Sequence, residues 1–176
     1  VFRANNMVVT YGGANYIMNK FDEYFHYTNV QADIGYPYMV QALFTVDEAL
    51  INRAEAYAQL EQFDLATKDL NDFASVRINN YNVAGHGFTI EKAKNFTGIE
   101  DPKEAVIQSI LDAKQKEFMQ EGLRWLDIIR HDINVVHNHI ADNGLETNDT
   151  LKVNDPRRVF QIPLHARNQG LPANDR

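Results

Sequence analysis

The chain has 176 residues, a mass of 20.2 kDa, a net charge of −7 and no cysteine. A chain of this length can bury a hydrophobic core, and the lack of cysteine excludes a disulfide scaffold or a Cys-ligated metal or haem site within it. No stripe of Lys and Arg is present to neutralise phosphates, which argues against a nucleic-acid partner. No run of about 18 apolar residues predicts a transmembrane helix.

Residues 1–44 differ in composition from the rest of the chain. They hold ten of the nineteen aromatic residues, including six of the eight Tyr. Turn-forming residues such as Gly12 and Pro37 interrupt them, and no helical period is sustained, although Met7–Tyr11 is compatible with a strand. We predict an irregular, aromatic-rich segment that packs on other parts of the protein.

Residues 45–78 are predicted to form a helical hairpin. Thr45 and Glu48 fit a capping box, and Asp64 is a candidate N-cap for the second helix. Apolar residues recur at helical spacing between and after these caps: Leu50, Ala54, Tyr57, Leu60, Ala66, Leu70 and Phe73. Two such helices joined by a few residues pack antiparallel.

Residues 79–101 are predicted to be a loop, with a short helix that starts at Thr89 and covers Ile90–Asn95. Residues 102–133 are predicted to form a second helical hairpin, because Asp101, Pro102 and Glu104 make a strong helix start. Gly122 marks the joint between its two helices. The remaining residues, 134–176, are predicted to be an irregular tail with turns at Asn143-Gly144 and Asp155-Pro156.

The first hairpin matches the tetratricopeptide pattern at several positions. A large apolar residue, a small residue, a Tyr, an aromatic and an Ala follow one another at the expected places: Leu50, Ala54, Tyr57, Phe63 and Ala66. The small residues let paired helices approach closely, but Phe73 stands where a small residue is usual. One such unit cannot bury both of its faces, so neighbouring units are expected.

Four segments, in matching order and spacing, resemble the RagB/SusD family of nutrient-uptake outer-membrane lipoproteins of Bacteroidetes-type bacteria. Phe44–Tyr57 looks like the first helix of the late repeat of the family, and Asp69–Arg77 is similar to its DLN-x-x-R stretch. Ile110–Arg130 resembles its ERR-KEL-x-x-EG-x-R-x-x-DL-x-R motif, apart from Ala113, where an acid is usual. Ile162-Pro163 and Asn168–Asn174 resemble its closing segment.

The resemblance covers about residues 40–176 and implies that the chain is the C-terminal part of a longer protein. It implies a mainly α fold of tetratricopeptide-like hairpins with long loops, and a lipid anchor that lies upstream. The implied function is non-catalytic capture of an oligosaccharide or other nutrient at the cell surface, for delivery to a SusC-like TonB-dependent transporter. It assigns no catalytic residue, no cofactor, no metal and no particular ligand-binding residue here.

Polar residues around Gly122 are the densest group of candidates for chemistry. Glu117 and Glu121 lie four apart on one helix face, and a carboxylate pair is used in glycoside hydrolysis only when it flanks the bond from two sides. We therefore interpret Glu117, Glu121, Arg124, Asp127 and Arg130 as a structural network that fixes the angle between two helices, with Arg bonding carboxylate in a bidentate manner.

The histidines are weaker candidates for a functional site. His131, His137 and His139 cluster in the sequence and would offer two imidazoles on one side of a strand, but no carboxylate follows at a ligand spacing. His86 lies between two glycines and is interpreted as a loop residue.

Aromatic faces suit sugar rings, and the Tyr and Phe residues at 11, 16, 21, 24, 25, 27, 36 and 38 are the part of the chain with a composition typical of sugar binding. We expect most of them to pack residues 1–44 onto the helices. Tyr36 and Tyr38, on either side of Pro37 in a turn-like stretch, are the first pair to test.

Three functions compete on these residues. The first is a nutrient-binding component of an uptake complex, the second a helical-repeat scaffold that binds proteins, and the third a carbohydrate-active enzyme. The Glu121–Arg124 motif and the closing segment favour the first over the second, because plain repeat proteins need neither. The lack of two carboxylates on separate elements weighs against the third.

Overall fold

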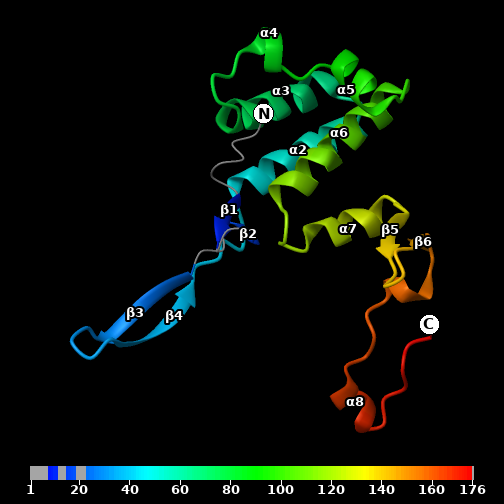
Figure 1. Cartoon of the computed structure of the whole chain (residues 1–176). Coiled ribbons are helices and arrows are strands. Elements are labelled where there is room, and N and C mark those ends of the chain that lie inside the picture. The colour runs from blue at the N-terminus through cyan, green and yellow to red at the C-terminus, as the bar shows by residue number, and fades with distance from the viewer. Residues whose placement is uncertain (1–7, 12–14, 19–22, 176) are drawn as a thin grey trace. The chain divides into compact units, whose positions relative to one another are not determined.

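A computed structural model describes residues 8–11, 15–18 and 23–175 of the chain (Figure 1). About 48% of the structure is helical, and the described strands form three two-stranded antiparallel sheets. The fold is therefore mixed α/β, and the expectation of a mainly α fold was wrong. The chain divides into two compact units, residues 1–114 and 115–176, which we describe separately.

The first unit begins with two β-hairpins where an irregular segment was predicted. Strands β1 (Val8–Tyr11) and β2 (Asn15–Met18) pair, as do β3 (Glu23–Asn29) and β4 (Ile34–Met39) (Figure 1). The turn of the second hairpin is closed by the Asn29 side chain, whose Oδ1 accepts a hydrogen bond from the Ala32 amide at 3.1 Å. Residues 1–7, 12–14 and 19–22 of the predicted irregular segment lie outside the described residues. The prediction failed because aromatic residues occupy both faces of β3–β4, so no alternation marks the strands.

Helices α2 (Val46–Gln59) and α3 (Phe63–Arg77) form the predicted helical hairpin. The cap at Thr45 is confirmed, because its hydroxyl accepts from the Glu48 amide at 3.1 Å. The second helix begins at Phe63 with Gln62 as N-cap, so the expectation for Asp64 was wrong. Side chains without exposed surface lie on both helices: Ala54, Ala58 and Ala66.

Two ion pairs join these antiparallel helices. Arg53 on α2 donates from Nε and from Nη2 to the two carboxylate oxygens of Asp69 on α3, each at 2.8 Å. Arg77, in the last turn of α3, pairs with Asp47, in the first turn of α2, at 2.5 Å. These positions place an acid near a helix N-terminus and a base near a C-terminus, where each helix dipole favours them.

The predicted loop 79–101 contains two short helices, α4 (Val83–His86) and α5 (Ile90–Thr97). The expected start of α5 is confirmed, since the Thr89 hydroxyl accepts from the Lys92 amide at 3.2 Å. Helix α6 (Pro102–Glu117) follows, and its predicted cap is also confirmed, because the Asp101 carboxylate accepts from the Glu104 amide at 2.8 Å. Helix α6 supplies the largest buried apolar group: Ala105, Val106, Ile107, Ile110 and Leu111.

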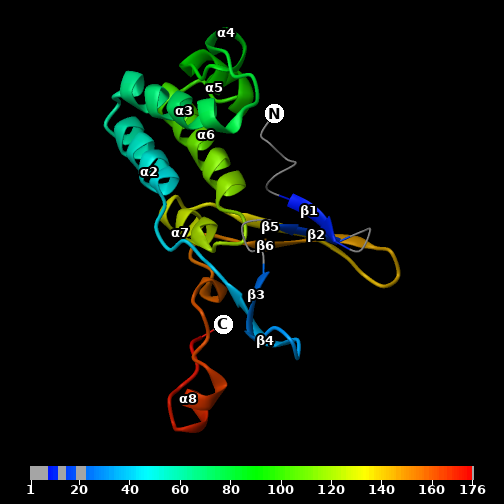
Figure 2. The ribbon, with the colours of Figure 1, turned by 90° about the vertical axis from the view of Figure 1, so that its left-hand side faces the viewer.

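The second unit holds α7 (Leu123–Arg130), β5 (Val135–Ile140), β6 (Glu146–Leu151), the 3₁₀ helix η2 (Pro156–Arg158) and α8 (Leu164–Asn168). Both predicted helices of 102–133 are present; their packing as a hairpin stays a prediction. Strands β5 and β6 run side by side (Figure 2). The prediction of an irregular tail over 134–176 was therefore wrong for these elements, and the predicted turn at Gly144, with a φ of 79°, closes this hairpin. In the part of the chain that the structure describes, no helix is long and apolar enough to cross a membrane.

A buried ion pair links α2 to α6 within the first unit. Lys114 Nζ lies 3.1 Å from Glu55 Oε2, and their side chains are 7% and 4% exposed. Removal of one partner from such a pair leaves the other charge buried and without this contact, which is costly in free energy.

We predict that Glu55→Gln lowers the free energy of unfolding by about 3–5 kcal/mol, and that the double variant Glu55→Gln/Lys114→Met recovers most of this loss. Urea denaturation followed by circular dichroism measures both. The control is Lys68→Ala, which removes the exposed pair with Asp72 and should cost less than about 1 kcal/mol. Equal effects of Glu55→Gln and Lys68→Ala would contradict the prediction.

Candidate functional site

The joint between α6 and α7 is built around Gly122. Its φ is 81°, the left-handed region, and a Cβ at this position would meet no atom within 4 Å. The need for glycine is therefore conformational and not steric. Backbone bonds from Glu121 to the Phe118 carbonyl at 3.1 Å and from Trp125 to the Gly122 carbonyl at 3.2 Å complete the turn.

The polar network predicted around this joint is present in part. Asp127 is buried, and Arg130 donates from Nη2 to its Oδ1 at 2.8 Å. Glu117 and Glu121 are half-buried. The Nη1 atom of Arg124 is buried without a hydrogen-bond partner among the described residues, so the predicted bidentate contact is not among the described contacts.

The histidine cluster does not converge on one point. His137 and His139 lie exposed on β5, where they face Asp149 and Thr147 across the sheet. Among the described residues, no three His, Asp or Glu side chains are placed to hold a metal ion. His86 is the last residue of α4 and not a loop residue, and its Nδ1 accepts from the backbone amide of Asn82 at 3.1 Å.

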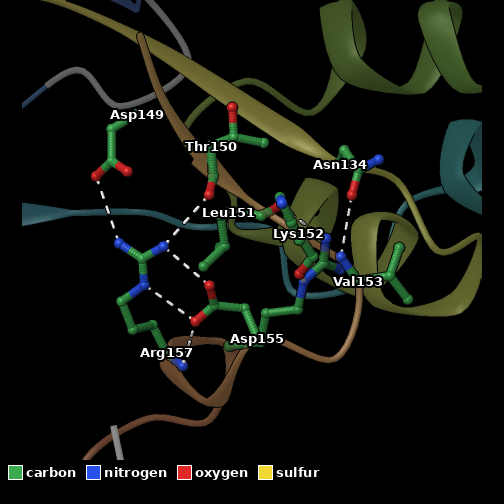
Figure 3. Close-up of polar contacts among 9 residues, drawn as sticks. Asn134, Asp149, Thr150, Leu151, Lys152, Val153, Asp155 and Arg157 are labelled. Atoms are coloured by element: carbon green, nitrogen blue, oxygen red, sulfur yellow. Dashed lines mark hydrogen bonds and ion pairs between the residues drawn. The ribbon is translucent and has the colours of Figure 1, made fainter.

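Two adjacent arginines organise the end of the β5–β6 hairpin, and the sequence analysis missed both. Arg157 donates from Nε and Nη2 to the two oxygens of Asp155, at 3.0 and 2.9 Å, and from Nη2 to the Thr150 carbonyl at 3.3 Å (Figure 3). Its Nη1 reaches Asp149 at 3.4 Å. The hydrogen bonds from Arg157 lower the pKa of Asp155 to about 2.

Arg158, in contrast, donates only to backbone carbonyls among the described residues. It donates to Lys152 at 2.7 Å, to Ile133 at 2.5 Å, to Leu151 at 3.2 Å and to Ile128 at 3.3 Å. The guanidinium thus joins the end of α7 to the end of β6, using the donors of its planar group. The sequence shows only that Arg158 follows the predicted turn at Asp155-Pro156. It does not indicate the four acceptors, because they are main-chain carbonyls, which every residue has.

The closing segment is held by a side-chain amide. Gln161 accepts from the Asn174 amide at 2.7 Å and donates to the Asn174 carbonyl at 3.0 Å, and the Asn174 side chain donates to the Phe160 carbonyl at 2.8 Å. Gln161 therefore pairs with the tail as a neighbouring strand would. Asn174 belongs to the closing segment that resembles the RagB/SusD family.

The tyrosines of the first unit lie on β3 and β4 and not in a turn, which corrects the expectation for Tyr36 and Tyr38. Tyr24 faces Tyr38, and His26 faces Tyr36, across the sheet. About half of the surface of each of these three tyrosines is exposed, and the expectation that most of the aromatics pack residues 1–44 onto the helices stays a prediction. Of the other aromatics singled out, Tyr11 and Tyr16 belong to β1 and β2, and Phe21 lies outside the described residues.

Comparisons of the chain with protein families, with curated proteins and with solved structures gave no match. The resemblance to the RagB/SusD family therefore stays a prediction that these comparisons do not test.

We predict that Asp155 titrates near pH 2 in the folded protein, below its usual value of 3.8. Because the folded pKa is the lower one, the contact with Arg157 stabilises the fold above about pH 4, and this contribution is lost as the pH falls toward 2. Carboxyl carbon NMR titration measures the midpoint. In Arg157→Ala the midpoint should return toward 3.8; an unchanged midpoint would refute the assigned cause.

We predict that Asn174→Ala frees the closing segment, because it removes the side-chain bond to Phe160 and weakens the pairing with Gln161. Limited trypsin digestion should then cleave after Arg167 several-fold faster than in the parent chain. Asn168→Ala is the control, since Asn168 is exposed at the end of α8 and should leave the rate unchanged. Equal cleavage rates in both variants would count against this role of Asn174.

Proposed function

We propose that this chain is the C-terminal portion of a RagB/SusD-type surface lipoprotein. In this proposal the protein captures an oligosaccharide at the outer membrane without catalysis and passes it to a SusC-like TonB-dependent transporter. The proposal rests on the four sequence segments that resemble the family, since no other similarity to known proteins was found.

The observation that carries the proposal is that the residues of the most specific motif have defined structural roles. Gly122, the Gly of its EG pair, takes the left-handed conformation that glycine adopts most readily. The Asp of its DL pair, Asp127, is buried. Its Oδ1 accepts a hydrogen bond at 2.8 Å from Nη2 of Arg130, the last Arg of the motif. A motif matched by chance would place its charged and glycine residues without regard to such constraints.

The closing segment gives a second, independent support. Asn174 stands at the last position of the family pattern, and two-way hydrogen bonds with Gln161 fix it. A polar segment without such contacts would fray, so these hydrogen bonds give the residues of the closing pattern a defined structural role.

The helical part supports the finer fold that we propose, tetratricopeptide-like hairpins in an α–α superhelix. Ala54 and Ala66 have no exposed surface, as the small positions of such a hairpin require. Exposed apolar side chains lie on the same two helices, among them Val46, Leu65 and Val76. One unit leaves a face uncovered, so these residues are suited to contact neighbouring units of a longer protein.

Affinity electrophoresis of the longer protein that carries this chain tests the proposal. We predict that gels containing a polysaccharide retard the protein, with no release of reducing sugar on prolonged incubation. The coding sequence upstream should specify a signal peptide that ends in a lipidated Cys. Release of reducing sugar would favour an enzyme, and a plain cytosolic start would overturn the surface-lipoprotein proposal. A protein retained by no polysaccharide would point to the protein-binding scaffold.

A further inference from the structure

The β3–β4 hairpin has two faces of different chemistry. Successive side chains of a strand point to opposite faces, so the observed register sorts the residues into two sets. One set, which we call the tyrosine face, contains the rings of Tyr24, His26, Tyr36 and Tyr38, and alternation along β4 places Ile34 on the same side. The opposite set contains the more apolar side chains: Phe25, Tyr27, Pro37 and Met39.

The tyrosine face is made of two cross-strand ring pairs. The rings of Tyr24 and Tyr38 have centroids 5.6 Å apart and are inclined by 30°, and those of His26 and Tyr36 are 5.2 Å apart and inclined by 45°. The three tyrosines are 52%, 44% and 54% exposed, for Tyr24, Tyr38 and Tyr36. None of their hydroxyls hydrogen-bonds to another described residue, so ring surface and hydroxyls are both available to a ligand.

Contacts on the opposite face of the hairpin determine the register of β3 and β4, and so place the tyrosines on one face. Phe25 and Tyr27 make an edge-to-face contact with centroids 4.8 Å apart. Gly35 is necessary there, because a Cβ would lie 2.5 Å from the Phe25 ring and would overlap the His26 carbonyl oxygen. Since a shift of one residue would exchange the two faces, the close approach at Gly35 fixes the register that presents the tyrosines together.

We propose that the tyrosine face is a contact site for a neutral oligosaccharide, an inference that rests on the function proposed above. The C–H faces of sugar rings stack on aromatic rings, and phenol and imidazole groups exchange hydrogen bonds with sugar hydroxyls. The thirty residues from Glu23 to Asn52 include no Lys or Arg. The carboxylates of an acidic glycan would therefore have no Lys or Arg of this segment to pair with. A neutral glycan does not require such a partner.

The spacing of the ring pairs indicates a ligand longer than one sugar. The two pairs are two residues apart along each strand, which corresponds to about 7 Å. A single sugar ring covers one pair, so two linked units are needed to use both. Oligosaccharides should therefore bind more tightly than the monosaccharide of which they are made.

The composition of the face favours a sugar over a protein partner. The core of a protein interface is more apolar than its rim and depleted of charged residues, with Tyr, Trp and Phe enriched. On this hairpin Phe25, Tyr27, Pro37 and Met39 gather on the other face, whereas each of the four rings of the tyrosine face carries a hydroxyl or a ring nitrogen that can hydrogen-bond to a sugar. A protein partner is thus better suited to the Phe25 face.

The test compares variants of the longer protein by affinity electrophoresis in starch, galactomannan, xylan and dextran, with polygalacturonate as the acidic glycan. We expect Tyr36→Ala/Tyr38→Ala to weaken retention on the neutral polysaccharide that binds best by at least about tenfold. Tyr36→Phe/Tyr38→Phe, which keeps the rings and loses the hydroxyls, should give a smaller loss. Polygalacturonate should not retain the parent protein.

Tyr27→Ala is the matched control, because it removes a tyrosine of similar exposure, 47%, from the opposite face of the same hairpin. It should leave retention unchanged. Wild-type retention that survives in the double Ala variant would overturn the inference and leave the proposed function intact. Retention of the parent protein by no polysaccharide would instead overturn the proposed function. Equal losses in Tyr27→Ala and the double variant would show that the hairpin fold matters and not the tyrosine face, and would also overturn the inference.

Discussion

The helical part depends on the close approach of α2 and α3. Ala54, Ala58 and Ala66 have no exposed surface, so a larger side chain at any of them would overlap the residues that cover it. The bidentate pair between Arg53 and Asp69 holds only while that distance is kept, since both of its bonds are 2.8 Å long. The small buried residues thus allow close packing around these helices, and the ion pair stabilises the arrangement in which its atoms meet.

Features that depend on neighbouring residues could be predicted from the sequence. The caps at Thr45, Thr89 and Asp101 were all predicted correctly, because a hydroxyl or carboxylate reaches an amide only three residues away. The turn at Gly144 was also predicted correctly, because an adjacent Asn-Gly pair is itself a local turn signal. Asp64 failed as a cap although it is a good N-cap residue, since the backbone turns into the helix earlier, at Gln62.

Features that join distant residues could not be predicted. The four carbonyls that bind Arg158 come from residues as far away as Ile128, and no side chain marks them in the sequence. The strands were missed because their side chains are mostly exposed on both faces, so neither β3–β4 nor β5–β6 shows the alternation of a half-buried sheet. In the candidate site, residue types were therefore predictable, and the faces on which they lie were not.

Pro37 shows why the difference between a turn and a strand matters for function. A turn over Tyr36, Pro37 and Tyr38 would point the two tyrosines in different directions. In β4 they are two residues apart and so share one face, while Pro37 lies on the other face beside Met39. The same residues that looked like a break in the chain thereby become the centre of an aromatic surface. The register holds that surface together, so Tyr36 and Tyr38 present their rings on the same side of β4, each next to a ring of β3.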